Sequence, residues 1–72
     1  MGKITQNDIK LGKRIRRLRR QLDLTQEKLA ERVGVSVTHI GLVETSKRRA
    51  SLKTLQKIAN VLKVKTRDLL PF

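Results

Sequence analysis

The sequence predicts an all-α fold of five short helices packed around one aliphatic core. Three observations support this fold class. Apolar residues recur at spacings of three and four along most of the chain, which is the period of an amphipathic helix. Thr25, Ser36 and Ser51 precede such apolar stripes, as N-cap residues do. No segment shows the sustained alternation of apolar and polar residues that indicates a β-strand.

The first predicted helix follows residues 1–6, which show no periodicity and which we expect to be mobile. Asn7 is its expected N-cap, and Asp8 lies in the first turn, where a negative charge interacts favourably with the helix dipole. The inward stripe of this helix consists of Leu11, Ile15, Leu18 and Leu22.

The second and third helices are expected to be close neighbours in the chain. Thr25 caps the second helix, and Ser36 caps the third, which runs to about Thr45. The residues of the second helix that face inward are Leu29, Ala30 and Val33.

Two further helices complete the predicted fold. Ser51 caps the fourth helix, and Thr66 with Asp68 opens a short last helix that Pro71 ends. The inward stripe of the fourth helix consists of Leu52, Leu55, Ile58, Ala59 and Leu62.

The composition restricts the classes of function. We expect one domain over residues 1–72, with no separate catalytic or effector domain. The chain has 18 Lys and Arg residues against six Asp and Glu residues, and its formal net charge is +12. Such an excess of positive charge implies an anionic partner.

Several kinds of site and location are disfavoured. Cysteine is absent and histidine occurs once, so we expect no metal, no other cofactor and no small-molecule ligand. No apolar run approaches the roughly 18 residues that span a bilayer, so we expect no membrane partner. The protein is therefore expected to be cytoplasmic and associated with the nucleoid.

The segment from about residue 25 to residue 45 carries a helix-turn-helix pattern. Gly34 follows Val33 at the expected end of a helix, where a left-handed backbone costs glycine almost nothing. Ala30 is small enough for a second helix to cross closely over it. The apolar positions that would lock the two helices at a fixed angle are Leu29, Val35, Ile40 and Val43. In this unit the second helix reads DNA.

These residues resemble the lambda-repressor-like (Cro/xenobiotic-response-element) helix-turn-helix family. The resemblance covers about residues 11–70, and its marks are LTQEKLAERVGVS, HIGLVE, SLKTLQKIANVLKV and DLL. It implies a compact five-helix fold with the helix-turn-helix at the second and third helices. It also implies that the third helix docks in the major groove of double-stranded DNA, and that a homodimer binds a roughly palindromic operator.

The resemblance assigns base contacts to Val37, Thr38 and Leu42, and we add Gly41 because it shares their outer face. The family often has a glutamine that reads adenine where this chain has Val37. The valine and Leu42 can offer only apolar contacts, most naturally to thymine methyl groups, whereas Thr38 can donate or accept a hydrogen bond. Two alternatives stay open: Leu42 packs sideways on the first helix or a loop, and Val37 merely starts its helix.

A second set of residues is expected to contact phosphate. The resemblance assigns such a contact to the side chain of Gln26, and backbone amides at helix starts add to it. His39 could donate to phosphate or be a bystander. The basic loop after the third helix lies beside the groove, although a charge run is often only a solvated surface. The full set is Gln26, Ser36, His39, Lys47, Arg48, Arg49 and Ser51.

Two features of the third helix concern its position. The resemblance places Arg19 opposite Glu44, where a pairing would fix that helix; the alternative is that Glu44 is a free surface carboxylate. Thr45 and Ser46 stand where the family commonly has a polar residue and a glycine. Ser46 must therefore adopt an uncommon backbone angle or reshape the turn.

The first helix is densely basic, with Lys13, Arg14, Arg16, Arg17, Arg19 and Arg20 around its apolar stripe. Long-range attraction to DNA and docking on a membrane surface are both consistent with this density. We favour DNA, because an apolar stripe that packs the core cannot also enter lipid.

A sequence-specific transcription regulator is the favoured function, with repression expected more than activation. A non-specific nucleic-acid packaging protein is the alternative, suggested only by the charge. RNA binding is disfavoured because Phe72 is the only aromatic residue, and an enzyme is disfavoured because no catalytic constellation can be assembled. A dimer contact is expected through Leu69, Leu70 and Phe72, unless the two leucines close the core of a single chain.

Overall fold

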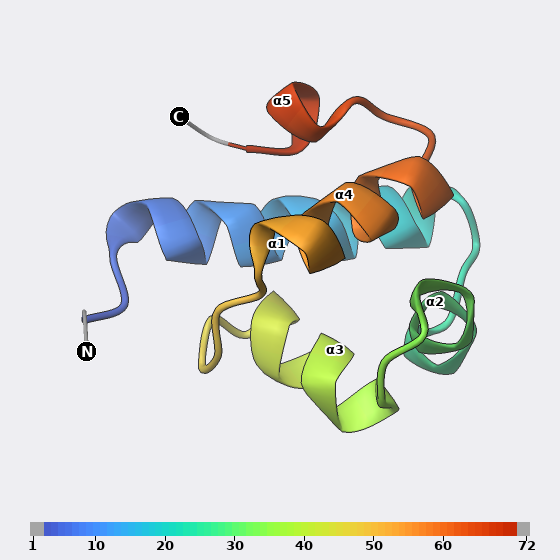
Figure 1. Ribbon diagram of the computed structural model, residues 1–72, viewed down its shortest axis with the longest axis horizontal. Helices are drawn as coiled ribbons and strands as arrows, with labels where there is room; N and C mark the ends of the chain where they lie inside the picture. The colour runs from blue at the N-terminus through green and yellow to red at the C-terminus, as the bar shows by residue number, and fades with distance from the viewer. Residues whose placement is uncertain (1–2, 71–72) are drawn as a thin grey trace.

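The computed structural model describes residues 3–70, and over that range it contains helices but no strand, which confirms the all-α fold class. Figure 1 shows α1 and α4 crossing the middle of the molecule, with α5 on one side of them and α2 and α3 on the other. The helices are α1 (Gln6–Gln21), α2 (Gln26–Val33), α3 (Val37–Glu44), α4 (Leu52–Val61) and α5 (Thr66–Leu69).

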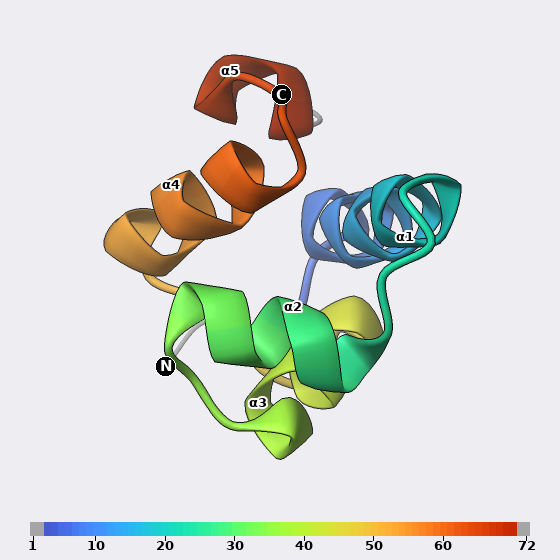
Figure 2. The ribbon, with the colours of Figure 1, turned by 90° about the vertical axis from the view of Figure 1, so that its right-hand side faces the viewer.

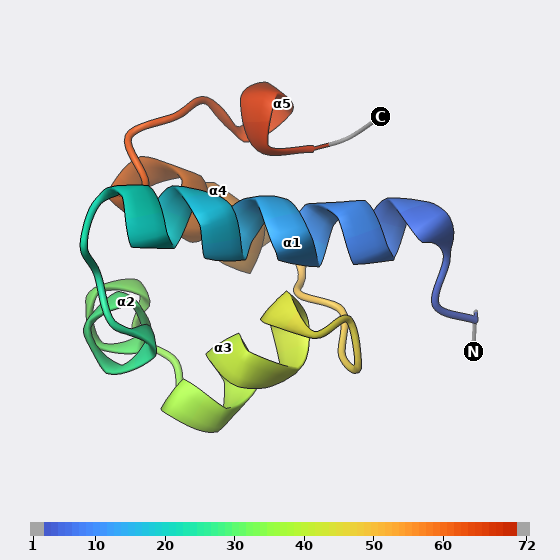
Figure 3. The same ribbon diagram turned by 180° about the vertical axis from the view of Figure 1, so that it is seen from behind.

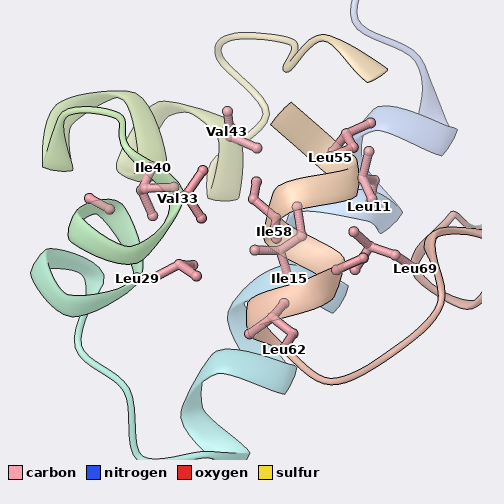
Figure 4. Close-up of a cluster of buried hydrophobic side chains, with 12 residues drawn as sticks. Leu11, Ile15, Leu29, Val33, Ile40, Val43, Leu55, Ile58, Leu62 and Leu69 are labelled. Carbon is pink, nitrogen blue, oxygen red and sulfur yellow. The ribbon is translucent and has the colours of Figure 1, made fainter. Parts of the chain in front are cut away.

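One aliphatic core joins all five helices (Figure 4). Its five largest fully buried side chains come one from each helix: Ile15, Leu29, Ile40, Ile58 and Leu69. Burying a side chain of this size stabilises the fold by about 1.5–3 kcal/mol. The arrangement explains why no helix can be removed without opening the core.

The first helix begins earlier than its sequence suggested. The N-cap of α1 is Thr5, so the assignment of Asn7 is wrong, and Gln6 is helical rather than part of an unstructured start. Thr5 and Asp8 form a capping box, in which Asp8 N donates to Thr5 Oγ1 over 3.2 Å and Thr5 N donates to Asp8 Oδ2 over 2.8 Å. These two reciprocal bonds favour Thr5 as the N-cap, because neither bond would form if the helix were capped at Asn7. The predicted caps Thr25, Ser36 and Ser51 are confirmed.

Two leucines expected to face inward are exposed instead. Leu22 is the C-cap of α1 and is 36% exposed, and Leu52 is the first residue of α4 and is 60% exposed. Both continue an apolar stripe correctly around the helix axis. They lie at a helix end, however, and periodicity does not reveal how far along its length a helix is covered by its neighbours.

Two left-handed residues shape the turns that border α3. Gly34, the C-cap of α2, has φ +87°, as its place in the pattern predicted. Ser46 has φ +61°, so it adopts the uncommon backbone angle expected for it. Its side chain is buried, and Ser46 Oγ donates to the carbonyl oxygen of Asp8 over 3.0 Å. That bond to α1 helps to hold a conformation which a non-glycine residue seldom takes.

The C-terminal part of the described chain closes the core of the single chain. Leu69 is fully buried, and Leu70 is partly buried against the core. Arg14 of α1 donates from Nη1 to the carbonyl oxygens of Asp68 and Leu70, over 3.2 and 3.3 Å. Leu69 is therefore not available for the expected dimer contact, and Phe72 lies outside the described residues. Within residues 3–70, no helix combines the length and the apolar character needed to cross a membrane.

Candidate nucleic-acid interface

The third helix lies at the edge of the molecule, packed on α2 and α1 (Figures 1 and 2). Its inner face is fixed by Ile40 and Val43, which are buried in the core. The turn before it is closed by two bonds, in which Gly34 N and Val35 N donate to the carbonyl oxygen of Ala30 over 2.8 and 3.0 Å. The helix-turn-helix predicted from the sequence is therefore present, and its second helix presents one face outward.

The expected base-contacting residues share this outward face. Val37 is 40% exposed and Thr38 is also exposed, whereas Gly41 and Leu42 are half-buried. Leu42 is not among the half-buried apolar side chains that pack on the core. Thr45, one turn further on, is exposed, but its hydroxyl donates to the carbonyl oxygen of Gly41 over 2.8 Å. Two exposed side chains, one partly accessible side chain and a glycine thus form a short, uncharged ridge.

A buried polar network holds α3 against the first two helices. Arg19 Nε donates to Glu44 Oε2 over 2.7 Å, and Arg19 Nη2 donates to Glu44 Oε1 over 3.1 Å. Arg19 Nη1 also donates to the carbonyl oxygen of Leu24 over 2.8 Å. The two charged residues are only 7% and 4% exposed. Arg19 and Glu44, which the family resemblance placed opposite each other, therefore meet in a two-pronged ion pair.

Gln26 extends this network, in a way that its sequence position did not suggest. Gln26 Nε2 donates to Glu44 Oε1 over 3.1 Å. The first residue of α2 is thereby tied to the last residue of α3. The same amide lies beside Gly41, where a Cβ added to the glycine would be 3.9 Å from either terminal atom of Gln26. The amide that was expected to bind phosphate thus also restrains the outward-facing helix.

The other polar residues near the helix starts have different surroundings. Ser36 Oγ accepts from His39 N over 3.0 Å, and Ser51 Oγ accepts from Thr54 N over 3.2 Å. Both hydroxyls are therefore used as caps. Nε2 of His39 is buried and has no hydrogen-bond partner among the described residues. Since that nitrogen does not reach the surface, it is not placed to donate to phosphate.

The basic loop after α3 folds back onto this helix. Lys47 N and Arg48 N both donate to the carbonyl oxygen of Leu42, over 2.8 and 3.2 Å, and both side chains are exposed. Arg49 differs, because its Nε and Nη2 donate to Asp8 Oδ2 over 3.2 and 3.1 Å. Neither periodicity nor motif matching pointed to this contact, since it joins residues 41 positions apart.

Asp8 has a pKa below its usual value. The backbone N–H of Thr5 is the largest cause, partial burial opposes it, and the Thr5 hydroxyl and the Arg49 guanidinium lower the pKa further. All three favourable contacts stabilise the ionised carboxylate. Asp8 is thus a charged anchor at the start of α1, facing the loop that follows α3.

The outer surface of α1 carries the largest group of cations without acidic partners in the part of the chain that the structure describes: Lys10, Lys13, Arg16, Arg17 and Arg20. Figure 3 shows this helix running along one whole side of the molecule. Of its apolar residues, Leu11 and Ile15 are buried in the core and Leu18 packs against it. The apolar stripe of α1 therefore packs inside the domain.

Comparison with known proteins identifies this architecture. The model of a family described as helix-turn-helix matches residues 15–69. The chain belongs to this helix-turn-helix family. The match includes the whole segment from α2 to α3 and the second half of α1. The resemblance to lambda-repressor-like proteins is thereby confirmed, and the family's members are DNA-binding transcription regulators rather than enzymes.

Three similar proteins illustrate the relationship. An uncharacterised HTH-type transcriptional regulator of Archaeoglobus fulgidus is 42% identical over 59 residues, which are 82% of this chain and 83% of the relative. The restriction-modification controller protein C.AhdI from Aeromonas hydrophila superposes with a TM-score of 0.87 at 35% identity, over 92% of this chain and all of the other. The P22 c2 repressor, solved in complex with a synthetic operator, gives a TM-score of 0.81 at 31% identity, over 85% and 92% of the two chains.

Proposed function

We propose that the protein is a sequence-specific transcription regulator that binds a roughly palindromic operator as a homodimer and acts as a repressor. The observation that carries this proposal is the outward face of α3, held rigidly by a buried ion pair and presented beside a basic loop. The P22 c2 repressor, which shares the fold, is a repressor crystallised on an operator. Cytoplasmic action on nucleoid DNA accords with this function.

The base contacts come from the face that the network leaves exposed. Val37 and Leu42 offer methyl groups to thymine, and Thr38 offers a hydroxyl that can donate or accept. The backbone of Gly41 lies between them and allows close approach to the base edges. With no amide or charged side chain on this ridge, we expect recognition to be strongest at A·T pairs.

The phosphate contacts flank the reading helix on both sides. The N-termini of α2, α3 and α4 offer backbone amides at Gln26, Ser36 and Ser51, where the positive end of the helix dipole also attracts phosphate. Lys47 and Arg48 add two exposed cations from the loop. Nε2 of His39 is buried, so a phosphate contact of this residue would have to use another of its atoms.

The homodimer is proposed from the size of the recognition surface. One eight-residue helix reads only a few base pairs, which is too little to select a site from a genome. Two copies related by a two-fold axis, with their reading helices about 34 Å apart, would enter successive major grooves on one face of the DNA. The operator would then repeat its sequence in inverted order.

A selection from a random duplex library, followed by sequencing, tests the function directly. A sequence-specific dimer should enrich an inverted repeat whose half-sites are centred about one helical turn apart. The alternative, a non-specific packaging protein, is suggested by the net charge of +12. It would retain DNA without enriching any sequence, and that outcome would overturn our proposal.

A further inference from the structure

The three consecutive cations of the loop after α3 are not equivalent. All three are exposed, but Lys47 and Arg48 form no ion pair with any residue from 3 to 70. Arg49 donates from Nε and Nη2 to Asp8 Oδ2, and from Nη2 also to the carbonyl oxygen of Lys3. One edge of the guanidinium, formed by Nε and Nη2, is therefore already occupied by α1 and the segment before it, and Nη1 has no bond to residues 3–70.

The carboxylate that holds Arg49 is fixed independently of it. Asp8 Oδ2 accepts from Thr5 N over 2.8 Å and from Thr5 Oγ1 over 3.0 Å, as part of the cap of α1. The carbonyl oxygen of Asp8 also accepts a hydrogen bond from the hydroxyl of Ser46, at the start of the loop. Asp8 thus binds the loop at two points, once through its carbonyl oxygen and once through its carboxylate.

We propose that Asp8 is a positioning residue that withholds Arg49 from DNA, so that Lys47 and Arg48 are the phosphate contacts of the loop. To bind Nε and Nη2 of Arg49, a phosphate would have to displace a carboxylate that the helix cap keeps in place. The charge of Asp8 would also repel the incoming phosphate. This inference rests on the proposed function, and it revises the expectation that all three cations contact the backbone.

Such an arrangement affects selectivity rather than base reading. A phosphate contact strengthens binding to every sequence, because it carries no direct sequence information. Withholding one arginine therefore weakens binding to bulk DNA while the contacts from α3 stay unchanged. For a small domain with a net charge of +12, non-specific sites are the main competitor of the operator.

The salt dependence of binding to a random-sequence duplex tests the inference, because each phosphate contact adds about 0.9 to the magnitude of the slope of log K against log salt. Arg48→Gln should lower that magnitude by about 0.9, whereas Arg49→Gln should leave it unchanged. Asp8→Asn keeps an acceptor for the cap but loses the charge, so it should free Arg49 and raise the magnitude by about 0.9. Adding Arg49→Gln to Asp8→Asn should restore the wild-type slope.

The matched control for charge is Asp23→Asn. Asp23 is exposed, its side chain forms no bond within residues 3–70, and its left-handed backbone suits asparagine. This variant should leave the slope as in the wild type. An Arg49→Gln slope that falls as far as that of Arg48→Gln would overturn the inference, and so would an unchanged slope for Asp8→Asn. If the wild type fails to bind duplex DNA at all, the proposed function itself is wrong, and this inference falls with it.

If Asp8→Asn does not fold, Arg49→Gln alone still decides the test, because Arg49→Gln leaves the capping box of Thr5 and Asp8 intact. Helical content, measured by circular dichroism, shows which variants are folded before any slope is compared.

Discussion

Gly12 of α1 lies directly against the backbone carbonyl of Glu44, at the end of α3. A Cβ on Gly12 would stand 2.7 Å from the carbonyl oxygens of both Val43 and Glu44, and 2.9 Å from Ser46 Oγ. Real Cβ atoms essentially never approach backbone that closely, so the position admits only glycine while α1 and α3 keep their places. This contact sets how closely α3 can approach α1.

Gly12→Ala should therefore destabilise the protein by up to about 2 kcal/mol, because an overpacking cost of about 1–3 kcal/mol outweighs the roughly 1 kcal/mol that alanine gains over glycine inside a helix. Gly41→Ala is the matched control, since a Cβ there meets nothing closer than 3.9 Å. It should leave stability unchanged or raise it by up to about 1 kcal/mol. Urea unfolding measures the free energy of unfolding of both variants against the wild type. Equal stability of the two variants would show that α1 and α3 can move apart freely.

The ion pair between Arg19 and Glu44 should be strongly coupled. Removing one partner leaves the other buried and uncompensated, so Glu44→Gln or Arg19→Met alone should cost about 3–5 kcal/mol. The double variant should cost clearly less than the sum of the two, because no isolated charge remains. Thermal or urea unfolding of the wild type, the two single variants and the double variant measures this coupling. Additive losses would mean that the pair contributes no mutual energy.

Changing Thr38 should alter which sequence is bound rather than whether DNA is bound. Thr38→Asn places an amide on the outward face of α3, and it should shift the preference at one or two operator positions by about 1–3 kcal/mol. Thr38→Val keeps the shape and loses only the hydroxyl, so it separates hydrogen bonding from packing. The readout is the sequence motif selected from a random library. The same motif for all three proteins would remove Thr38 from the groove.

The stability contributed by Asp8 should depend on pH. Its pKa is lower in the folded protein than in the unfolded chain, chiefly through the backbone N–H of Thr5. The unfolded state therefore binds the proton more readily, and the stabilisation is present above the unfolded pKa, near 3.9, and is lost as the pH falls through the folded value. The difference in unfolding free energy between wild type and Asp8→Asn should shrink from pH 6 to pH 3. A constant difference would assign the effect to shape rather than charge.

Much of the fold follows from local patterns. Four of the five helices begin where the sequence indicated, because a polar cap before an apolar stripe is a local signal, as at Ser36 and Ser51. Gly34 was recognised because its left-handed backbone has a local cause. The exception, Thr5, was missed because 1–6 has no apolar periodicity, although the threonine and Asp8 three residues later are the mark of a capping box.

The features of the fold and of the candidate site that could not be predicted from the sequence are those that depend on residues far apart in the chain. The exposure of Leu52 depends on where neighbouring helices end, and the need for Gly12 depends on the approach of α3. The bond from Arg49 to Asp8 joins residues whose proximity only the folded chain creates. The contact between Arg19 and Glu44 was anticipated only through the family resemblance. Neither residue type nor spacing would have paired them.

The bonds from Arg14 to the carbonyl oxygens of Asp68 and Leu70 also join segments that are synthesised at different times. Between α1 and α5, Arg14 is synthesised before the residues at the end of α5 that accept its bonds. At about 5–20 residues per second, the roughly 50 residues between them take about 2–10 s to add. Throughout that time Leu11 and Ile15 lack part of their final surroundings, and the nascent chain carries an uncovered apolar face. The many cations of α1 would keep such a chain soluble by mutual repulsion.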